Sequence, residues 1–254
     1  MTLFRNVVLV AAIAGLLASI VMTALQTFST VPLILEAETY ETAGGGHSHD
    51  HGAAAVTDAA APAETTTSDA VVAEVEEGWA PEDGIERFTF TFLANLASGI
   101  GLALILVAVS EFAGGISSWR SGMLWGLSGF AAFTLAPSLG LPPELPGMPA
   151  GDLGARQVWW ITTVVATAGG LAMIAFRGTV LLSIVGVALI VAPHVIGAPQ
   201  PDSHATDVPA DLHHRFVVAS TVTMLVFWVL LGGLVGVIRS RFAVAEDVRH
   251  GQLA

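Results

Sequence analysis

Six apolar stretches, each close to the length of a bilayer crossing, constrain what this chain can fold into. They lie near residues 7–28, 90–110, 121–140, 157–175, 178–195 and 216–238. The hydrocarbon core of a bilayer is about 30 Å thick, so a spanning helix needs roughly 20 mostly apolar residues. Backbone groups inside a bilayer must bond to one another, and a helix achieves this within one segment. The sequence therefore predicts an all-α, polytopic membrane bundle with six transmembrane helices, or with five.

Two places in this pattern allow more than one interpretation. The first stretch follows Arg5 and could be a signal peptide, but its apolar run, Val7 to Leu25, exceeds the usual run of about 7–15 residues, and no clear A-x-A cleavage site follows. We therefore expect a retained helix. The fourth and fifth stretches are separated only by Arg177 and Gly178. They could form one re-entrant feature, but glycine turns tightly, which favours a hairpin of two helices.

The residue types that are missing exclude several function classes. The chain has no cysteine, which excludes disulfides, thiolate metal sites and iron–sulfur clusters. All nine basic residues are arginine, so a P-loop lysine, a Schiff base and a pyridoxal phosphate site are excluded, and we expect no ATP site. The HExxH and GxSxG motifs are absent, and we expect no enzyme activity. A net charge of −12 argues against binding of nucleic acid, which needs a basic surface.

Arginine placement predicts the orientation of the bundle. With the N-terminus in the cytoplasm, six arginines fall on the cytoplasmic side, namely Arg5, Arg120, Arg177, Arg239, Arg241 and Arg249. Only three fall outside, namely Arg87, Arg156 and Arg215. Because cytoplasmic segments of membrane proteins carry an excess of basic residues, we predict that both termini are cytoplasmic and that residues 36–87 lie outside.

The negative charge is concentrated in that outer segment. Between Glu36 and Asp83 there are twelve acidic residues and no basic ones, whereas the other nine acids balance the nine arginines. Residues 44–77 are rich in Ala, Gly, Thr and Glu, and such a segment buries too little apolar surface to offset the entropy of ordering. We therefore divide the chain into a first membrane helix (1–35), an acidic His-rich extracytoplasmic loop (36–87, with 44–77 largely disordered), a five-helix membrane bundle (88–239) and a cytoplasmic tail (240–254).

The sharpest local signal is a cluster of metal ligands, His47, His49, Asp50 and His51, flanked by glycines. Imidazole is a preferred ligand of divalent transition metals such as Co²⁺, Ni²⁺, Cu²⁺ and Zn²⁺. We predict that the cluster binds such an ion. A loop without fixed geometry favours Cu²⁺ or Zn²⁺ over Co²⁺. The alternative is that this segment is a metal-concentrating tether, or a variable low-complexity stretch without an indispensable role.

A second group of candidate ligands flanks the predicted helices at the outer face. His194 ends the fifth stretch directly after a proline, and the remaining candidates are His204, His213, His214, Glu36, Glu38 and Glu41. Oxygen and imidazole ligands from these helix ends could form an ordered site that receives the metal. The alternative is that they are ordinary solvated residues, because charge near helix ends is common.

Polar groups within the membrane are sparse: Asn95 and Ser98 lie in the second stretch, Glu111 at its inner end, Gln26 late in the first stretch and Gln157 at the start of the fourth. Of these, only Glu111 is ionisable, and we place it at the membrane interface. Small residues are abundant, which indicates close helix packing, and Gly232 and Gly236 match the GxxxG motif weakly. Residues 87–143 and 156–199 resemble each other as helical hairpins, which indicates either a parallel internal repeat or a chance similarity of composition.

Several motifs at loops and helix ends carry a resemblance to a known family. The chain contains PLILEAETYE after the first stretch, GWAPEDGIERFTFT before the second, and then WGLSGFAAFTLAPSLGLPPELPG, ARQVWW and APHVIGAP, with Phe-Trp in the last stretch. With these motifs the chain resembles CbtA, a family of predicted cobalt transporter subunits of bacteria. The resemblance covers essentially the whole chain apart from residues 52–77.

The resemblance implies a protein of the cytoplasmic (inner) membrane that takes up cobalt for cobalamin synthesis. It also implies a partner, CbtB, a small subunit with one membrane helix and a His-bearing end. We therefore expect an integral membrane subunit for uptake of a divalent transition metal, Co²⁺ or else Ni²⁺ or Zn²⁺, without a permanently bound cofactor. The alternative is a non-transporting membrane receptor or scaffold that binds metal and hands it to a partner subunit.

Overall fold

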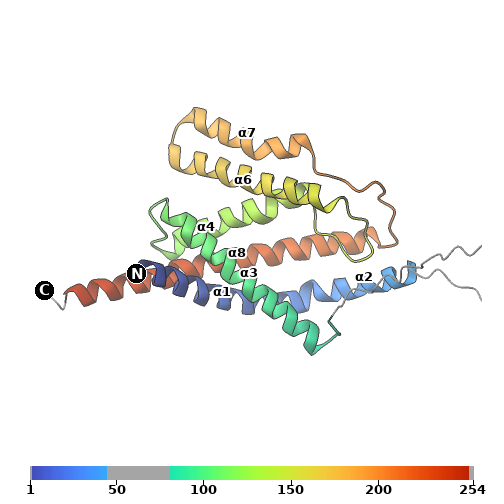
Figure 1. Cartoon of the computed structure of the whole chain (residues 1–254), viewed down its shortest axis with the longest axis horizontal. Coiled ribbons are helices and arrows are strands. Elements are labelled where there is room, and N and C mark those ends of the chain that lie inside the picture. The colour runs from blue at the N-terminus through green and yellow to red at the C-terminus, as the bar shows by residue number, and fades with distance from the viewer. Residues whose placement is uncertain (1, 45–80, 252–254) are drawn as a thin grey trace, which may run out of the picture.

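The structure, a computed structural model, describes residues 2–44 and 81–251, and within these ranges it consists of helices without strands (Figure 1). The elements are α1 (Thr2–Ser29), α2 (Val31–Gly44), α3 (Ile85–Glu111), α4 (Trp119–Phe130), the π-helix η1 (Ala131–Leu135), α5 (Ala136–Gly140), α6 (Leu153–Arg177), α7 (Val180–Ile196) and α8 (Ala210–Gly251). The predicted all-α membrane bundle is confirmed. The predicted disorder of residues 44–77 falls almost entirely outside the described residues.

The apolar helices run back and forth between two ends of the bundle (Figure 1). The start of α1 and the end of α8 lie at the same end, which we call the termini end (Figure 1). The end of α2 and the start of α3 lie toward the opposite end, which we call the loop end (Figure 1). The side of the membrane that each end faces stays a prediction.

Five helices of the described chain are long and apolar enough to cross a bilayer: α1, α3, α6, α8 and the continuous helix formed by α4, η1 and α5. A further apolar helix, α7, has 17 residues and is therefore only about 25 Å long. Gly178 ends α6 in the left-handed conformation, with φ of 59°, and α7 starts two residues later. The predicted hairpin of two helices at Arg177 and Gly178 is thus confirmed, and the choice between five and six spans depends on α7.

The helix α2 extends the first membrane helix beyond the bilayer-length stretch. Thr30 still donates its backbone N–H to the Gln26 carbonyl at 3.1 Å, so the chain stays helical up to the junction. Pro32, in the first turn of α2, has no N–H and leaves the Phe28 carbonyl without its helical donor, which separates the two helices. As a result, α2 leads away from α1 and contacts α8 at the loop end.

Glycines on both helices make the contact between α4 and α8. A Cβ built on Gly232 of α8 would lie 2.1 Å from the carbonyl oxygen of Gly122 in α4. A Cβ on Gly126 of α4 would lie 2.2 Å from the carbonyl oxygen of Trp228, and one on Gly236 would lie 2.3 Å from a carbonyl of the opposite segment. Such backbone-to-backbone approach is the packing mode of GxxxG helices in membranes. The GxxxG match in α8 is therefore one half of a matched pair.

Close glycine contacts also join two other helix pairs. A Cβ on Gly170 of α6 would lie 2.4 Å from the carbonyl oxygen of Gly186 in α7. A Cβ built on Gly15 of α1 would likewise lie only 2.7 Å from the backbone Cα and N atoms of Ile100 in α3. Thus α6 packs mainly along α7, whereas α3 packs mainly along α1. The internal repeat of hairpins stays a prediction.

Buried apolar side chains form two cores. The main core lies where α1, α3, α4 and α8 meet, and it includes Val107, Trp228, Leu231 and Val235. A smaller core at the loop end joins α2 to the start of α8 and to the connection after α5, through Ala37, Leu145, Val208, Leu212 and Phe216. This second core fixes the position of α2 beyond the membrane-length part of α1.

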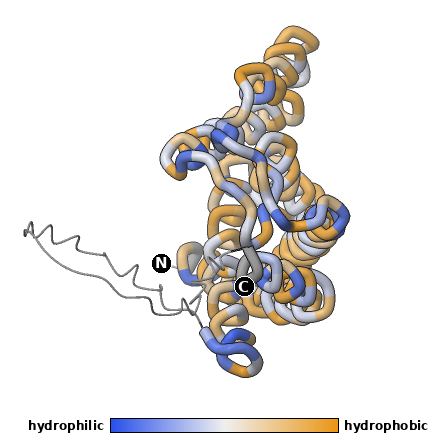
Figure 2. Tube along the Cα trace, turned by 90° about the vertical axis from the view of Figure 1, so that its right-hand side faces the viewer, coloured by the Kyte–Doolittle hydropathy of each residue, from blue (hydrophilic) through white to orange (hydrophobic). Residues whose placement is uncertain are grey.

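The outward faces of the bundle are also apolar. On α6 and α7, Val165, Val180 and Leu181 are 66%, 78% and 72% exposed. Apolar residues dominate the helices when the bundle is viewed along its length (Figure 2). Exposed apolar surface on this scale fits contact with lipid, as expected for a bundle that crosses a bilayer.

We predict that Gly232→Ala strongly destabilises the bundle, because the new methyl group would collide with the Gly122 carbonyl and push α4 and α8 apart. Overpacking of this kind typically costs about 1–3 kcal/mol. Thermal unfolding of the purified protein in detergent should show a clear fall in Tm. Gly169→Ala is the matched control, because a Cβ there meets no atom within 4 Å. An equal fall in the control would contradict the steric explanation.

Candidate functional site

The structure does not gather the predicted metal ligands into one group. The cluster of His47, His49, Asp50 and His51 lies outside the described residues, and no side-chain position is described for Glu41. Among the side chains that are described, no group of three or more His, Cys, Asp or Glu lies close enough to hold a metal ion. The role of these residues as ligands stays a prediction.

The four described histidines among the candidates occupy separate positions. His194 lies in the last turn of α7, and its ring meets Trp159 edge-on, with 5.8 Å between centroids. Its buried Nε2 has no hydrogen-bond partner in the described part of the chain. His213 Nε2 lies 3.1 Å from the Pro143 carbonyl oxygen, while His204 and His214 are exposed. The imidazoles therefore do not converge.

The described glutamates instead form ion pairs at the loop end. Both carboxylate oxygens of Glu38, in α2, accept hydrogen bonds from Arg87, in α3, at 2.8 and 3.3 Å. Asp83, one helical turn before Arg87, lies 2.8 Å from its Nε. One arginine thus binds two carboxylates and ties α2 to the start of α3.

A second arginine at this end has the same arrangement. Arg215 of α8 lies 3.4 Å from Glu36 of α2 and 3.2 Å from Asp211. The two groups together form what we call the acidic rim: Glu36, Glu38, Asp83, Asp211, Arg87 and Arg215. Four carboxylates and two guanidinium groups give the rim a formal charge of −2. A negative surface of this kind raises the local concentration of cations.

The remaining arginine at the loop end is also ion-paired. Arg156, at the start of α6, donates to Glu144 at 2.8 Å, and both side chains are about three-quarters buried. All three arginines that the sequence assigns to the outer side therefore have carboxylate partners. Their positive charge is neutralised locally, so the rim keeps its net negative charge.

A second polar feature lies between α1 and α3, within the membrane-length part of both helices. The Asn95 Nδ2 group donates to Thr23 Oγ1 at 2.9 Å and to Gln26 Oε1 at 2.6 Å. We call these three residues the amide cluster. Ser19 Oγ donates to the backbone oxygen of Asn95 at 2.8 Å, which fixes α3 beside α1. Asn95 lies about 15 Å along α3 from Ile85, since a helix rises 1.5 Å per residue, so the cluster is well inside the span.

Hydroxyl groups continue from the amide cluster toward the acidic rim. Ser29 Oγ lies 3.3 Å from Thr223 Oγ1 of α8, and Thr30 is buried at the junction of α1 and α2. The other buried hydroxyls of α1, Ser19 and Thr23, also lie in its half nearer the loop end. The interface of α1 with α3 and α8 is therefore more polar toward the loop end than toward the termini end.

The sequence alone singles out Asn95 and Gln26 as polar residues within the membrane, but not their partner Thr23. Threonine is ordinary in a membrane helix, because its hydroxyl can bond to its own backbone, so composition does not mark it. Spacing is the signal that could have found it. Ser19, Thr23 and Gln26 follow one another in steps of four and three residues, which places them on one helix face.

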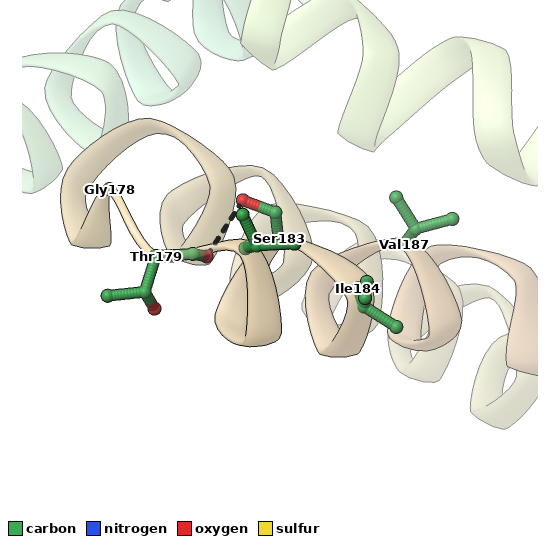
Figure 3. A pocket seen from close by; sticks show the side chains of 6 residues that line it. Gly178, Thr179, Ser183, Ile184 and Val187 are labelled. Carbon is green, nitrogen blue, oxygen red and sulfur yellow. Dashed lines mark hydrogen bonds between the residues drawn. The ribbon is translucent and has the colours of Figure 1, made fainter.

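Two other places with polar side chains are weaker candidates for a functional site. At the termini end, Glu111 pairs with Arg239 of α8, as fits the predicted interfacial position of Glu111. A shallow hollow lies at the turn between α6 and α7, where Ser183 Oγ donates to the Thr179 carbonyl oxygen at 3.2 Å (Figure 3). The residues that line this hollow have no charged side chain, so we assign no site to it.

We predict that Glu38→Gln weakens the rim, because Arg87 loses its two-oxygen partner. The free energy of unfolding should fall by about 1 kcal/mol at most, since partly exposed ion pairs contribute little. Denaturant unfolding in detergent should show that the loss shrinks at high salt, which screens such pairs. Glu82→Gln, at an exposed neighbouring glutamate, is the control. A loss that ignores salt, or that the control shares, would rule out the ion pair as its cause.

The comparisons with known proteins agree with this picture of a membrane bundle. The sequence model of one family, described as "Probable cobalt transporter subunit (CbtA)", matches residues 4–240. No curated protein and no solved structure matches the chain significantly. The matched residues begin in α1 and end in α8, and so include every apolar helix of the described bundle. The chain therefore belongs to the CbtA family of probable cobalt transporter subunits.

Proposed function

We propose that this chain is an integral membrane subunit for the uptake of a divalent transition metal, that Co²⁺ is its cargo, and that the cobalt supplies cobalamin synthesis. The observation that carries the proposal is the CbtA match over residues 4–240. The fold supports it, because five described helices are long and apolar enough to cross a bilayer. In this proposal the chain performs no catalytic step and holds no permanent cofactor.

The proposed orientation places the loop end outside the cytoplasmic (inner) membrane. The arginine count supports this, because only Arg87, Arg156 and Arg215 of the nine arginines belong to the loop end, and cytoplasmic segments carry the excess of basic residues. Inward movement of a cation is driven by the membrane potential, at about 2.3 kcal/mol per charge per 100 mV. A divalent ion gains twice this energy, so the potential alone can drive uptake.

The acidic rim and the outer His cluster have different tasks in this proposal. His47, His49, Asp50 and His51 supply imidazole and carboxylate ligands that collect the metal. The rim, with its formal charge of −2, then attracts the dication to the interface of α1, α3 and α8. His194, His204, His213 and His214 are further ligands at the same end.

The proposal includes two kinds of partner. The exposed apolar faces of the helices contact the lipid bilayer. The family description as a subunit implies at least one further protein, and we propose the small single-helix subunit CbtB. An ATP-binding site in this chain is not part of the proposal, since the sequence lacks the lysine of a P-loop.

One observation favours a second candidate function, that of a receptor or scaffold that binds metal and hands it on. A permeating cation must replace its water with other ligands. In the described bundle, charged residues lie toward the ends of the spans, and α4, α8, α6 and α7 are packed backbone to backbone through glycine. A protein with this interior could bind metal at its rim while a partner subunit carries it across.

We predict that cells without other cobalt transporters take up labelled Co²⁺ when they express this chain together with CbtB. Expression of each subunit alone shows which of them is needed, and an excess of unlabelled Ni²⁺ or Zn²⁺ tests the choice of metal. Uptake by the chain alone would establish a self-sufficient transporter. Slow uptake by CbtB alone, which this chain accelerates, would favour the receptor role. No uptake in any combination, with both proteins in the membrane, would overturn the cobalt proposal.

We predict that the loop end is reached from outside the cell. Because the chain has no cysteine, single cysteines can be placed in it directly. Ser203→Cys, at an exposed position of the loop end, should react with an impermeant maleimide on intact cells. Ser117→Cys, exposed at the termini end, should react only after permeabilisation. The reverse pattern would invert the orientation, and equal reactivity of both on intact cells would contradict the crossing of the bilayer between them.

A further inference from the structure

We propose that the amide cluster is a transit site for the cation within the membrane, where neutral oxygens of Thr23, Gln26 and Asn95 replace part of its hydration shell. The inference rests on the proposed transport function and assigns it a place within the membrane span, between α1 and α3.

The geometry of the amide cluster points to a cation. Two oxygens from successive turns of α1 converge on one donor group, Asn95 Nδ2, at 2.9 Å from Thr23 and 2.6 Å from Gln26. The amide –NH₂ carries partial positive charge, and it fills the place between two acceptors. A half turn of the Asn95 amide exchanges its nitrogen for Oδ1, which is an acceptor. Three oxygens from two helices then face the same point.

The neutral oxygens of the amide cluster suit transient binding of an ion and not tight retention. A conducting site must bind an ion well enough to admit it and weakly enough to release it. Imidazole suits divalent transition metals, whereas neutral carbonyl oxygen suits harder ions, so the amide cluster should hold Co²⁺ loosely. Capture and selection then belong to the outer histidines, and the amide cluster needs only to lower the cost of partial dehydration.

The surroundings of the amide cluster differ toward the two ends of the bundle. Toward the loop end, Ser29 and Thr223 offer further hydroxyls on the way to the acidic rim. Toward the termini end, the same helices bury an apolar layer in which Ala14, Ala18, Val107, Leu231 and Val235 are 0% exposed. An apolar constriction excludes water and hydrated ions. The described arrangement therefore separates the amide cluster from the termini end, and passage requires the layer to open.

The absence of native cysteine allows a direct test that does not depend on transport. Thr23→Cys keeps the size of the side chain and adds a thiol to the amide cluster. In intact cells that also express CbtB, we expect an impermeant methanethiosulfonate reagent to label this thiol. Co²⁺ should slow the labelling several-fold. Gln26→Cys, at a partly exposed position of the amide cluster, repeats the test if Thr23→Cys does not accumulate in the membrane.

Ser110→Cys is the matched control, because Ser110 of α3 is as buried as Thr23 but lies on the other side of the apolar layer. It should stay unlabelled from outside. Absence of labelling at the amide cluster, or labelling that Co²⁺ leaves unchanged, would overturn the transit site, and so would labelling of Ser110→Cys at the same rate. Co²⁺ uptake by the unaltered chain, measured in parallel, separates the two proposals. Uptake without protection removes only the transit site, whereas protection without uptake keeps the cation site and removes the transport function.

Discussion

The backbone contact between α4 and α8 is the constraint on which the rest of the structure depends. Lipid gives apolar helices no hydrophobic reason to associate, so they rely on close packing and hydrogen bonds. Glycines at Gly122, Gly126, Gly232 and Gly236 allow that packing, because any Cβ there would meet a carbonyl oxygen. In turn, α8 contacts α1, α2 and α3, and thereby sets where Arg215 meets Glu36. The acidic rim and the hydroxyls of the α1–α8 interface are both consequences of this placement.

The distribution of polar groups follows from the cost of burying charge. A charged side chain in the middle of a bilayer is expensive, whereas a neutral hydrogen-bonded group costs little and contributes about 0.6 kcal/mol to helix association. Ion pairs accordingly lie at the ends of the helices, as with Arg87 and Glu38 at one end and Arg239 and Glu111 at the other. Inside the span, Asn95 satisfies its amide with neutral oxygens. A dication that follows this route meets full charges first and dipoles afterwards.

Hydropathy predicted the membrane helices because the bilayer itself imposes their length, and each apolar stretch corresponds to a helix of the structure. It underestimated α8, since only residues 216–238 are continuously apolar while the helix covers Ala210–Gly251. The ion pairs of the acidic rim could not be predicted from the sequence. Glu38 and Arg87 are 49 residues apart and Glu36 and Arg215 are 179 apart, so no local spacing connects them. Gly232 and Gly236 were recognisable as a motif, and Gly122 and Gly126 in α4 have the same GxxxG spacing, but the pairing of these two motifs emerges only from the packing.

The amide cluster also gives a physical reason for a family of subunits. Its three oxygens come from two neighbouring helices, and Gln26 and Asn95 are only partly buried, so the cluster lies at the edge of the α1–α3 pair and not at the centre of the bundle. A divalent metal ion there would keep open coordination positions toward the membrane, and the described spans supply no charge to fill them. A second membrane helix beside α1 and α3 would complete the coordination and exclude lipid. The transport proposal and the scaffold alternative then differ in one physical respect, which is whether the ion passes between this chain and its partner or through the partner alone.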